Sequence, residues 1–150
     1  MAALEFTGLV SEVASGTTTL TLVQLVAPAN HLVRVLDYTV SFKGTNATAE
    51  PIEVQLLRQT TAGTSAALTL VKNNDSIAET ILTTALKTFT AEPTAGDILD
   101  VEYVHPQGGS KTFVAPSPDC WIIGGGDRVG IRVVTPGATV KVAVRIRAEE

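Results

Sequence analysis

The sequence predicts an all-β fold: an antiparallel β-sandwich of about eight to ten strands, in a single domain that spans residues 1–150. Threonine and valine are abundant, and their β-branched side chains fit a pleated surface. Apolar and polar residues alternate along several segments, as they do on a strand whose successive side chains point to opposite faces. Clusters of Gly, Pro, Asn and Asp interrupt these segments at short intervals, which is typical of turns between short strands.

The strongest strand signal in the first half of the chain is Leu32–Lys43. Its even positions are mostly apolar and its odd positions from Asp37 onward are polar, so the predicted strand has one apolar and one polar face. Weaker alternation predicts strands at Thr17–Leu25 and Ile52–Leu56. Residues 1–16 are less regular, and we expect them to form either a first edge strand or an extended arm.

The middle of the chain carries a mixed signal. A short strand is expected at Leu68–Lys72. Within residues 76–90, apolar residues recur at every fourth position, which favours a helix, whereas the many threonines favour a strand. We expect a short helical turn at Ser76–Glu79, followed by a strand that reaches Thr90.

Ile98–Val104 is a further alternating segment with an unusual polar face. Its odd positions from Leu99 to Tyr103 are apolar, and Asp100 and Glu102 share the other face. Two carboxylates can perform acid–base chemistry when their environments separate their pKa values. Two acids on one side of a strand more often form a solvated face, and that is what we expect here.

The cleanest alternation is the last segment, Val140–Arg147, where Val and Ile at even positions are expected to pack inward. Lys141, Arg145 and Arg147 project from its polar face. They either form a solvated surface or an interface that meets an acidic neighbour, and they are the candidate site residues. Shorter strands are expected before this segment at Thr112–Ala115, Trp121–Ile123 and Val129–Val133.

Composition and charge narrow the class of protein. Only 17% of the 150 residues are charged, the net charge is -4, and no two Lys or Arg residues are adjacent. Nucleic-acid binding requires clustered positive charge, so we do not expect this chain to bind a nucleic acid. No apolar run approaches the ~20 residues of a membrane helix, and the first residues do not resemble a signal peptide. We therefore expect a soluble protein that is made in a cytoplasm.

Catalytic machinery is not recognisable in the sequence. The two histidines, His31 and His105, are far apart, and Cys120 is the only cysteine, which is too few ligands for a zinc site. No nucleophile elbow and no phosphate-binding glycine loop occurs. We expect no catalytic residues, no metal and no cofactor, and conclude that the chain is not an enzyme.

Three stretches together carry a resemblance: Val26–Asn30 leading into Val35–Gly44, Ile52–Gly63, and Gly126–Val133. With them, the whole chain resembles small β-rich virion proteins encoded among the head genes of tailed bacteriophages, including the decoration or cement proteins of the capsid exterior. The resemblance lies in the pattern of the chain rather than in an exact motif. It implies a jelly-roll or related sandwich that forms trimers or dimers on the shell, and it transfers no site residue.

The expected function is therefore structural. We expect a decoration protein that assembles as a homo-oligomer, with a trimer as the expected form, and that binds the major capsid protein on the outside of the virion. The alternative is a carbohydrate- or receptor-binding sandwich, such as the head of a fibre. That alternative gains if Trp121 or Tyr103 is exposed beside a groove. An enzyme would require a deep pocket that holds His31 or His105 together with a carboxylate.

Overall fold

The computed structural model describes residues 3–46 and 48–150, and these residues form strands and no helix. The predicted all-β antiparallel sandwich is confirmed. The twelve strands are β1 (Glu5–Ala14), β2 (Leu20–Val26), β3 (Leu32–Lys43), β4 (Ile52–Gln59), β5 (Thr64–Leu68), β6 (Val71–Lys72), β7 (Thr84–Ala91), β8 (Ala95–Val104), β9 (Ser110–Val114), β10 (Ile122–Gly124), β11 (Arg128–Val134) and β12 (Lys141–Glu149).

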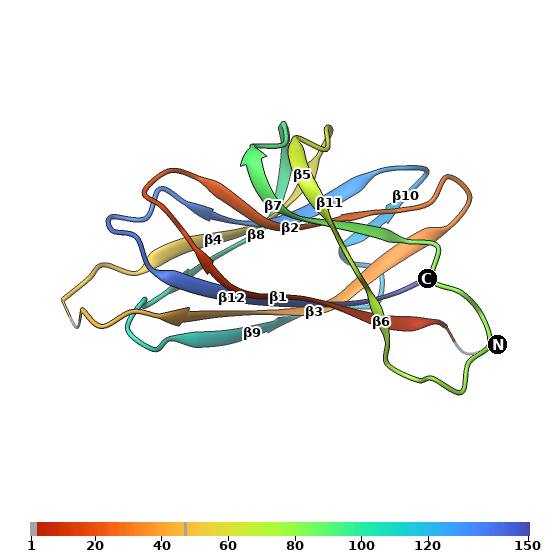
Figure 1. Ribbon diagram of the computed structural model, residues 1–150. Helices are drawn as coiled ribbons and strands as arrows, with labels where there is room; N and C mark the ends of the chain where they lie inside the picture. Colours follow the sequence, from red (N-terminus) through yellow and green to blue (C-terminus); the bar gives the residue numbers. More distant parts are fainter. Residues whose placement is uncertain (1–2, 47) are drawn as a thin grey trace.

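The strands form two stacked sheets, which are the lower and upper layers in Figure 1. Sheet A has the order β10-β3-β12-β1-β6, and β9 pairs with β3 on the same side as β10. Sheet B has the order β5-β7-β2-β11-β4-β8. Every pairing between the described strands is antiparallel, which is the arrangement that permits one buried and one solvated face on each sheet.

Strand pairing follows a nested order. β1 pairs with β12 in sheet A, β2 with β11 in sheet B, β3 with β9 and β10 in sheet A, and β4 with β8 in sheet B. Successive pairs therefore alternate between the two sheets. The segment from β5 to β7 is inserted between β4 and β8. Its strands β5 and β7 extend sheet B beyond β2, and β6 extends sheet A beyond β1. Residues 5–14, within the segment expected to be an edge strand or an arm, form β1 and are flanked by β12 and the two-residue β6.

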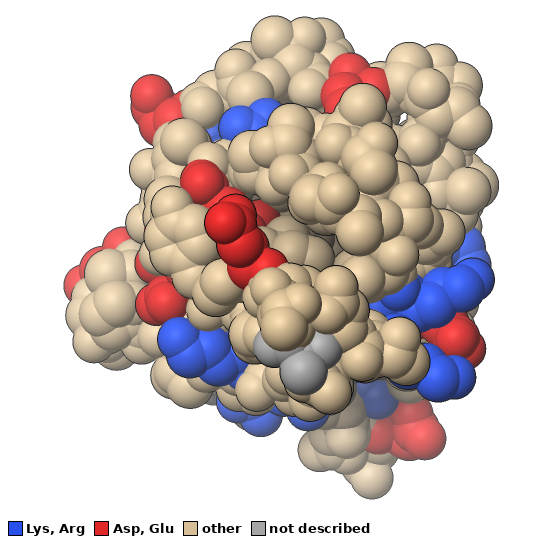
Figure 2. Space-filling view, turned by 90° about the vertical axis from the view of Figure 1, so that its left-hand side faces the viewer, with Lys and Arg blue, Asp and Glu red and all other residues tan. Residues whose placement is uncertain are grey.

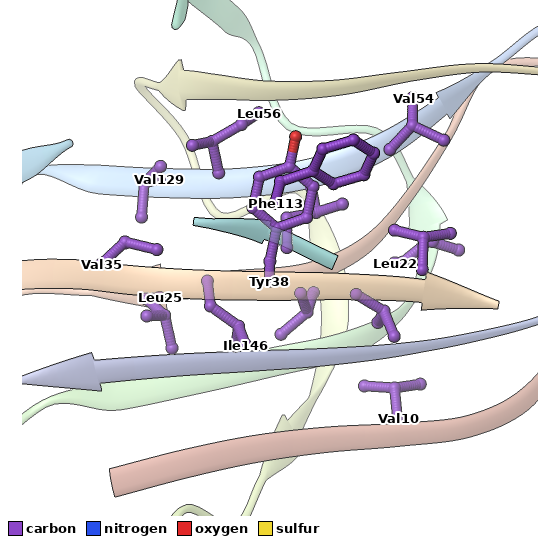
Figure 3. Close-up of a cluster of buried hydrophobic side chains, with 14 of the residues drawn as sticks. Val10, Leu22, Leu25, Val35, Tyr38, Val54, Leu56, Phe113, Val129 and Ile146 are labelled. Carbon is purple, nitrogen blue, oxygen red and sulfur yellow. The ribbon is translucent and has the colours of Figure 1, made fainter. Parts of the chain in front are cut away.

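The core lies between the sheets and is built from the alternating positions. Figure 3 shows side chains from both layers meeting there, among them Val35 and Tyr38 from β3, Ile146 from β12, and Leu56 from β4. The Tyr38 ring lies 4.8 Å from the ring of Phe113, centroid to centroid. Burial of these apolar side chains is the main term that favours folding, at roughly 25 cal/mol per Å² removed from water.

A β-bulge in β3 changes which positions of this strand face the core. Opposite β12 the register shifts between Arg147 and Ala148, which leaves Leu36 as the extra residue. Before the bulge the odd positions, such as Val35, are buried, and after it the even positions from Tyr38 onward are buried. The predicted bounds of this strand are therefore correct, but its apolar and polar faces exchange sides at Leu36, because one extra residue reverses the alternation.

The helical turn predicted at Ser76–Glu79 is wrong. A tight turn stands there instead, in which the side-chain oxygen of Asn74 accepts a 3.0 Å hydrogen bond from the amide of Ser76. The amide of Ile77 also donates a 3.3 Å hydrogen bond to the Asn74 carbonyl, so residues 74–77 close a single turn, and no helix follows it. The chain then runs extended to β7, and the Glu150 carboxylate accepts hydrogen bonds from the amides of Leu82 and Thr83.

The expected strand at Leu68–Lys72 is divided in the structure. β5 ends at Leu68 in sheet B, and β6 begins at Val71 in sheet A, so the chain crosses between the sheets at this point. This division gives two strands where one was expected. The described residues form twelve strands in all, which is more than the eight to ten expected. The sequence offers no glycine or proline there to mark the crossing.

The solvated face predicted for Asp100 and Glu102 is also wrong, because β8 is oriented the other way. Asp100 pairs with Leu56 and Glu102 with Val54, and both partners point into the core. The Tyr38 hydroxyl donates a 3.0 Å hydrogen bond to Asp100. Both carboxylates therefore lie on the inner side of an edge strand together with the buried Val104, and Val101 and Tyr103 face outward.

The outer face of sheet B carries a buried polar network. The Gln24 amide donates to Oε1 of Gln59 at 2.7 Å, and the Gln59 amide donates to the Thr21 hydroxyl at 2.9 Å. Thr21 in turn donates to the Glu92 carboxylate at 2.6 Å. Gly130 lies directly beneath this network, because a Cβ atom at that position would overlap the Gln59 amide.

We expect Gly130→Ala to destabilise the protein by about 1–3 kcal/mol, because the added methyl displaces Gln59 and leaves buried amides without partners. Gly137→Ala is the matched control, since nothing lies within 4 Å of the added methyl. Its effect should stay within about 0.5 kcal/mol. Urea unfolding followed by circular dichroism measures both changes, and equal stabilities for the two variants would contradict the role given to the network.

A second prediction concerns pH. Burial, followed by the nearby charge of Asp100, raises the pKa of Tyr38 far above its usual value. In the unfolded chain the tyrosine ionises near pH 10, whereas in the native state it stays protonated, so stability should fall as the pH rises above about 10. The slope expected from one proton is roughly 1.4 kcal/mol per pH unit.

Thermal or urea unfolding between pH 8 and about pH 11.5 tests this slope. Tyr38→Phe should lose about 1 kcal/mol at neutral pH, because its hydrogen bond to Asp100 is removed, and should show a shallower decline at high pH. Tyr103→Phe is the control, since it retains Tyr38 and should keep the full decline. Parallel curves for the wild type and Tyr38→Phe would contradict the assignment.

Candidate binding surfaces

The three candidate residues Lys141, Arg145 and Arg147 all lie on β12 and share the outer face of sheet A. Arg147 forms a 2.6 Å ion pair with Asp37 on β3, and Arg145 pairs with the same carboxylate at 3.3 Å. The Asp37 side chain is only 5% exposed, whereas both arginine side chains remain nearly half exposed. The structure thus brings Arg145 and Arg147 together and fixes them, while Lys141 lies at the start of the strand.

The part of this outer face where β3 meets β9 carries short polar side chains. Thr39 bonds to Thr112 at 2.8 Å, and Ser41 bonds to Ser110 at 3.0 Å, which links β3 to β9. Ala143 lies opposite Ser41 on the other side of β3. Short side chains thus occupy the middle of this face, and the longer Lys43 and Lys141 lie opposite each other at its end.

Two exposed apolar residues flank the arginines on this face. Leu9 on β1 lies opposite Arg145, and Val114 on β9 lies opposite Asp37. They are 61% and 67% exposed. Isolated exposed apolar residues are normal, but here they border fixed arginines, which is a composition common in protein interfaces.

A cleft of about 460 Å³ opens at one end of the sandwich. It lies between the β3–β4 loop, the β8–β9 loop and the β11–β12 loop, and its lining includes Glu50, Glu53 and Tyr103. Figure 2 looks onto this end and shows a hollow with acidic side chains at its rim, while Lys and Arg lie mainly lower, towards sheet A. A smaller hollow beside it is lined by Lys43 and Lys141, among others.

Tyr103 and Glu53 contact each other in the cleft. Tyr103 is 58% exposed, and its hydroxyl donates a 3.3 Å hydrogen bond to Glu53 on the neighbouring strand. The amide of Gln55 donates to the other oxygen of Glu53, and Gln55 itself accepts a 2.8 Å hydrogen bond from Arg132. The carboxylate is therefore held in one orientation at the edge of the cleft.

The residues with reactive side chains lie elsewhere. His31 is exposed, and Nδ1 of His105 accepts a 3.1 Å hydrogen bond from the amide of Gln107 in a turn. The Cys120 thiol contacts the Ser117 hydroxyl at 3.2 Å, and the adjacent Trp121 packs against Tyr38. Within residues 3–46 and 48–150, no three His, Cys, Asp or Glu side chains gather where they could hold a metal ion. The same residues include no helix long and apolar enough to cross a membrane.

Sequence patterns identified Tyr103 as a residue whose exposure matters, but they did not identify Glu53 or the cleft. Glu53 and Tyr103 are 50 positions apart and become neighbours only through the register of β4 against β8. No local motif signals this pairing. Asp37 was likewise recognised only as a polar position of β3, and its contact with two arginines follows from the register of β3 against β12.

Comparison with protein-family models, with curated proteins and with solved structures finds no match to this chain.

Proposed function

We propose that this protein is a structural virion protein, a capsid decoration or cement protein that binds the outer surface of a phage head and stabilises it. It assembles as a homo-oligomer, a trimer, and its partners are further copies of itself and the major capsid protein. The observation that carries this proposal is the outer face of sheet A, where two arginines are fixed by Asp37 and flanked by exposed apolar residues.

The nested pairing order supports a jelly-roll assignment within this proposal. In a jelly roll, a long antiparallel hairpin is rolled so that successive strand pairs alternate between two sheets. The pairs β1–β12, β2–β11, β3–β9/β10 and β4–β8 have this order, with β5 to β7 as an insertion. Such folds host many functions, so the fold adds to the proposal without deciding it.

The chemistry of the sheet A face supports an interface. Arginine is enriched in protein interfaces, and an arginine that is already oriented loses less conformational freedom when it binds. Asp37 orients Arg145 and Arg147 while leaving nearly half of each side chain exposed. The face would meet an acidic surface of a neighbouring copy, because the first 100 residues hold ten Asp and Glu against five Lys and Arg.

The edge strand β8 supports packing through faces rather than through sheet extension. Asp100 and Glu102 point inward, where Glu102 forms a 3.3 Å ion pair with Lys111 of β9. Inward-pointing charges on an edge strand oppose pairing with the edge of another sheet. A decoration protein at high local concentration on a shell needs this protection against uncontrolled aggregation.

Stabilisation of the shell follows from mass action. A protein that binds the assembled capsid and not its dissociated subunits shifts the equilibrium towards the assembled state. A stable contact of this kind buries roughly 1,200–2,000 Å² in total. This mechanism requires no active site. A rigid sandwich with one binding face is sufficient to bind the assembled shell.

The experiment that tests the proposal begins with the solution mass. Sedimentation equilibrium should give a trimer, that is, three times the 15.7 kDa of the chain. Val114→Glu places a carboxylate on the sheet A face. We expect this variant to dissociate the trimer, because the new carboxylate would face the acidic surface of the adjacent copy. Val101→Glu is the matched control: it makes the same change on the edge strand of sheet B and should leave the trimer intact.

Co-sedimentation then tests the shell as partner. The wild type and Val101→Glu should pellet with capsids of the virus that encodes the chain, and Val114→Glu should remain in the supernatant. A wild-type monomer that does not pellet with these capsids would contradict the proposal.

A second candidate function has one specific observation in its favour. Tyr103 is exposed and lines the cleft at the end of the sandwich, which is the arrangement that favours a carbohydrate- or receptor-binding module. Trp121 does not share this role, because it is half-buried against Tyr38.

A further inference from the structure

We propose that the cleft at the end of the sandwich binds a saccharide that is neutral or carries an amine, and that it rejects acidic sugars. This inference rests on the second candidate function and goes beyond it by naming the class of ligand. It is independent of the capsid proposal. The residues that carry it are Tyr103, Glu53 and Glu50, together with the prolines of the cleft wall.

The shape of the cleft fits a small sugar. Its volume of about 460 Å³ lies within the ~300–1,000 Å³ that is usual for small-molecule sites, and it suits a mono- or disaccharide. Pro51, Pro106 and Pro136 belong to its wall. Because proline fixes its backbone φ angle, these loop positions have little freedom to lose when a ligand binds.

Tyr103 supplies the apolar contact. The C–H groups of a sugar ring form a flat, weakly apolar face, and an exposed aromatic ring offers a complementary surface. With 58% of the residue exposed, the Tyr103 ring is accessible to a ligand in the cleft. Its hydroxyl is already bonded to Glu53, so the side chain is anchored at its polar end.

Glu53 supplies the polar contact. A carboxylate only accepts hydrogen bonds, and sugar hydroxyls are abundant donors, so the two are complementary. The hydrogen bonds from Tyr103 and Gln55 hold the carboxylate in place, and Arg132 orients Gln55 in turn. A group that is oriented before binding costs less entropy when the ligand arrives.

The charge of the cleft sets the selectivity. Glu50 and Glu53 line it, and no Lys, Arg or His is among its described lining residues. A uronic or sialic acid would bring a third carboxylate into this site, whereas an amino group would be attracted to the carboxylates and to the face of the Tyr103 ring. Neutral sugars should therefore bind, amino sugars should bind more tightly, and acidic sugars should bind least.

Three oligosaccharides of equal length test this order: the trimer of N-acetylglucosamine (neutral), the trimer of glucosamine (amine-bearing) and the trimer of galacturonic acid (acidic). Titration of isotope-labelled protein, followed by amide chemical shifts, reports both the affinity and the location. The amine-bearing trimer should bind roughly tenfold more tightly than the neutral one, and both should shift resonances of the β3–β4 and β11–β12 loops. The acidic trimer should cause no saturable shift.

Variants locate the contacts. Tyr103→Ala should weaken binding of the neutral and the amine-bearing trimers roughly tenfold. Glu53→Gln should reduce the preference for the amine-bearing trimer, because Glu50 remains. Val101→Ala is the control, because Val101 lies on the same outward face of β8 but does not line the cleft. It should bind as the wild type does. Unchanged circular dichroism spectra will show that each variant is folded.

Different outcomes contradict different claims. Equal binding of the acidic and neutral trimers overturns the ligand class but leaves a carbohydrate-binding module. Binding of spermidine without binding of the neutral trimer overturns the saccharide assignment in favour of a simple cation site. Failure of all three sugars to shift the cleft resonances overturns both this inference and the second candidate function. None of these outcomes alters the sedimentation test of the capsid proposal.

Discussion

The register of β3 against β12 is the constraint on which the rest of the molecule depends. Asp37 and Tyr38 follow the bulge at Leu36 and point to opposite sides of sheet A: Asp37 faces outward between Arg145 and Arg147, and Tyr38 faces the core. The Asp37 carboxylate orients two arginines on the outer surface, and the Tyr38 ring packs against Phe113 and Trp121 in the interior. Without the extra residue, the apolar half of the strand before the bulge would point to solvent, because a shift of one position exchanges the faces.

Tyr38 extends this constraint to the second sheet. Its ring packs against Phe113 and Trp121 within the sandwich, and its hydroxyl reaches Asp100 on β8. A buried tyrosine hydroxyl requires a partner, and an acceptor at this point of β8 provides one. Asp100 and Glu102 of β8 therefore face inward and Val101 and Tyr103 face outward, which leaves Tyr103 exposed beside the cleft. The cleft thus depends on a hydrogen bond across the open edge of the sandwich.

The sequence predicted the sandwich and most of its strands, because two-residue alternation is a local property. The bounds of β3 were predicted to the residue, and β12 was predicted within a few positions. Alternation separates two faces but does not say which one is buried, and for this reason the orientation of β8 was wrong. The bulge was also invisible, since Leu36 is apolar and fits the mostly apolar even positions of the predicted strand. The cleft joins loops that are distant in the chain, so only strand register brings its residues together.

The two proposed binding surfaces make different demands and do not compete for the same residues. The sheet A face uses Arg145 and Arg147, which are oriented along β12, whereas the cleft uses Glu53 and Tyr103 of sheet B at the end of the sandwich. Arg145 and Arg147 do not line the cleft, so an interface over them would not have to cover it. On a shell, such an arrangement would hold the sandwich by one side and present the loop end to the surroundings. Attachment and recognition are then separate properties of one rigid core, each of which can change without the other.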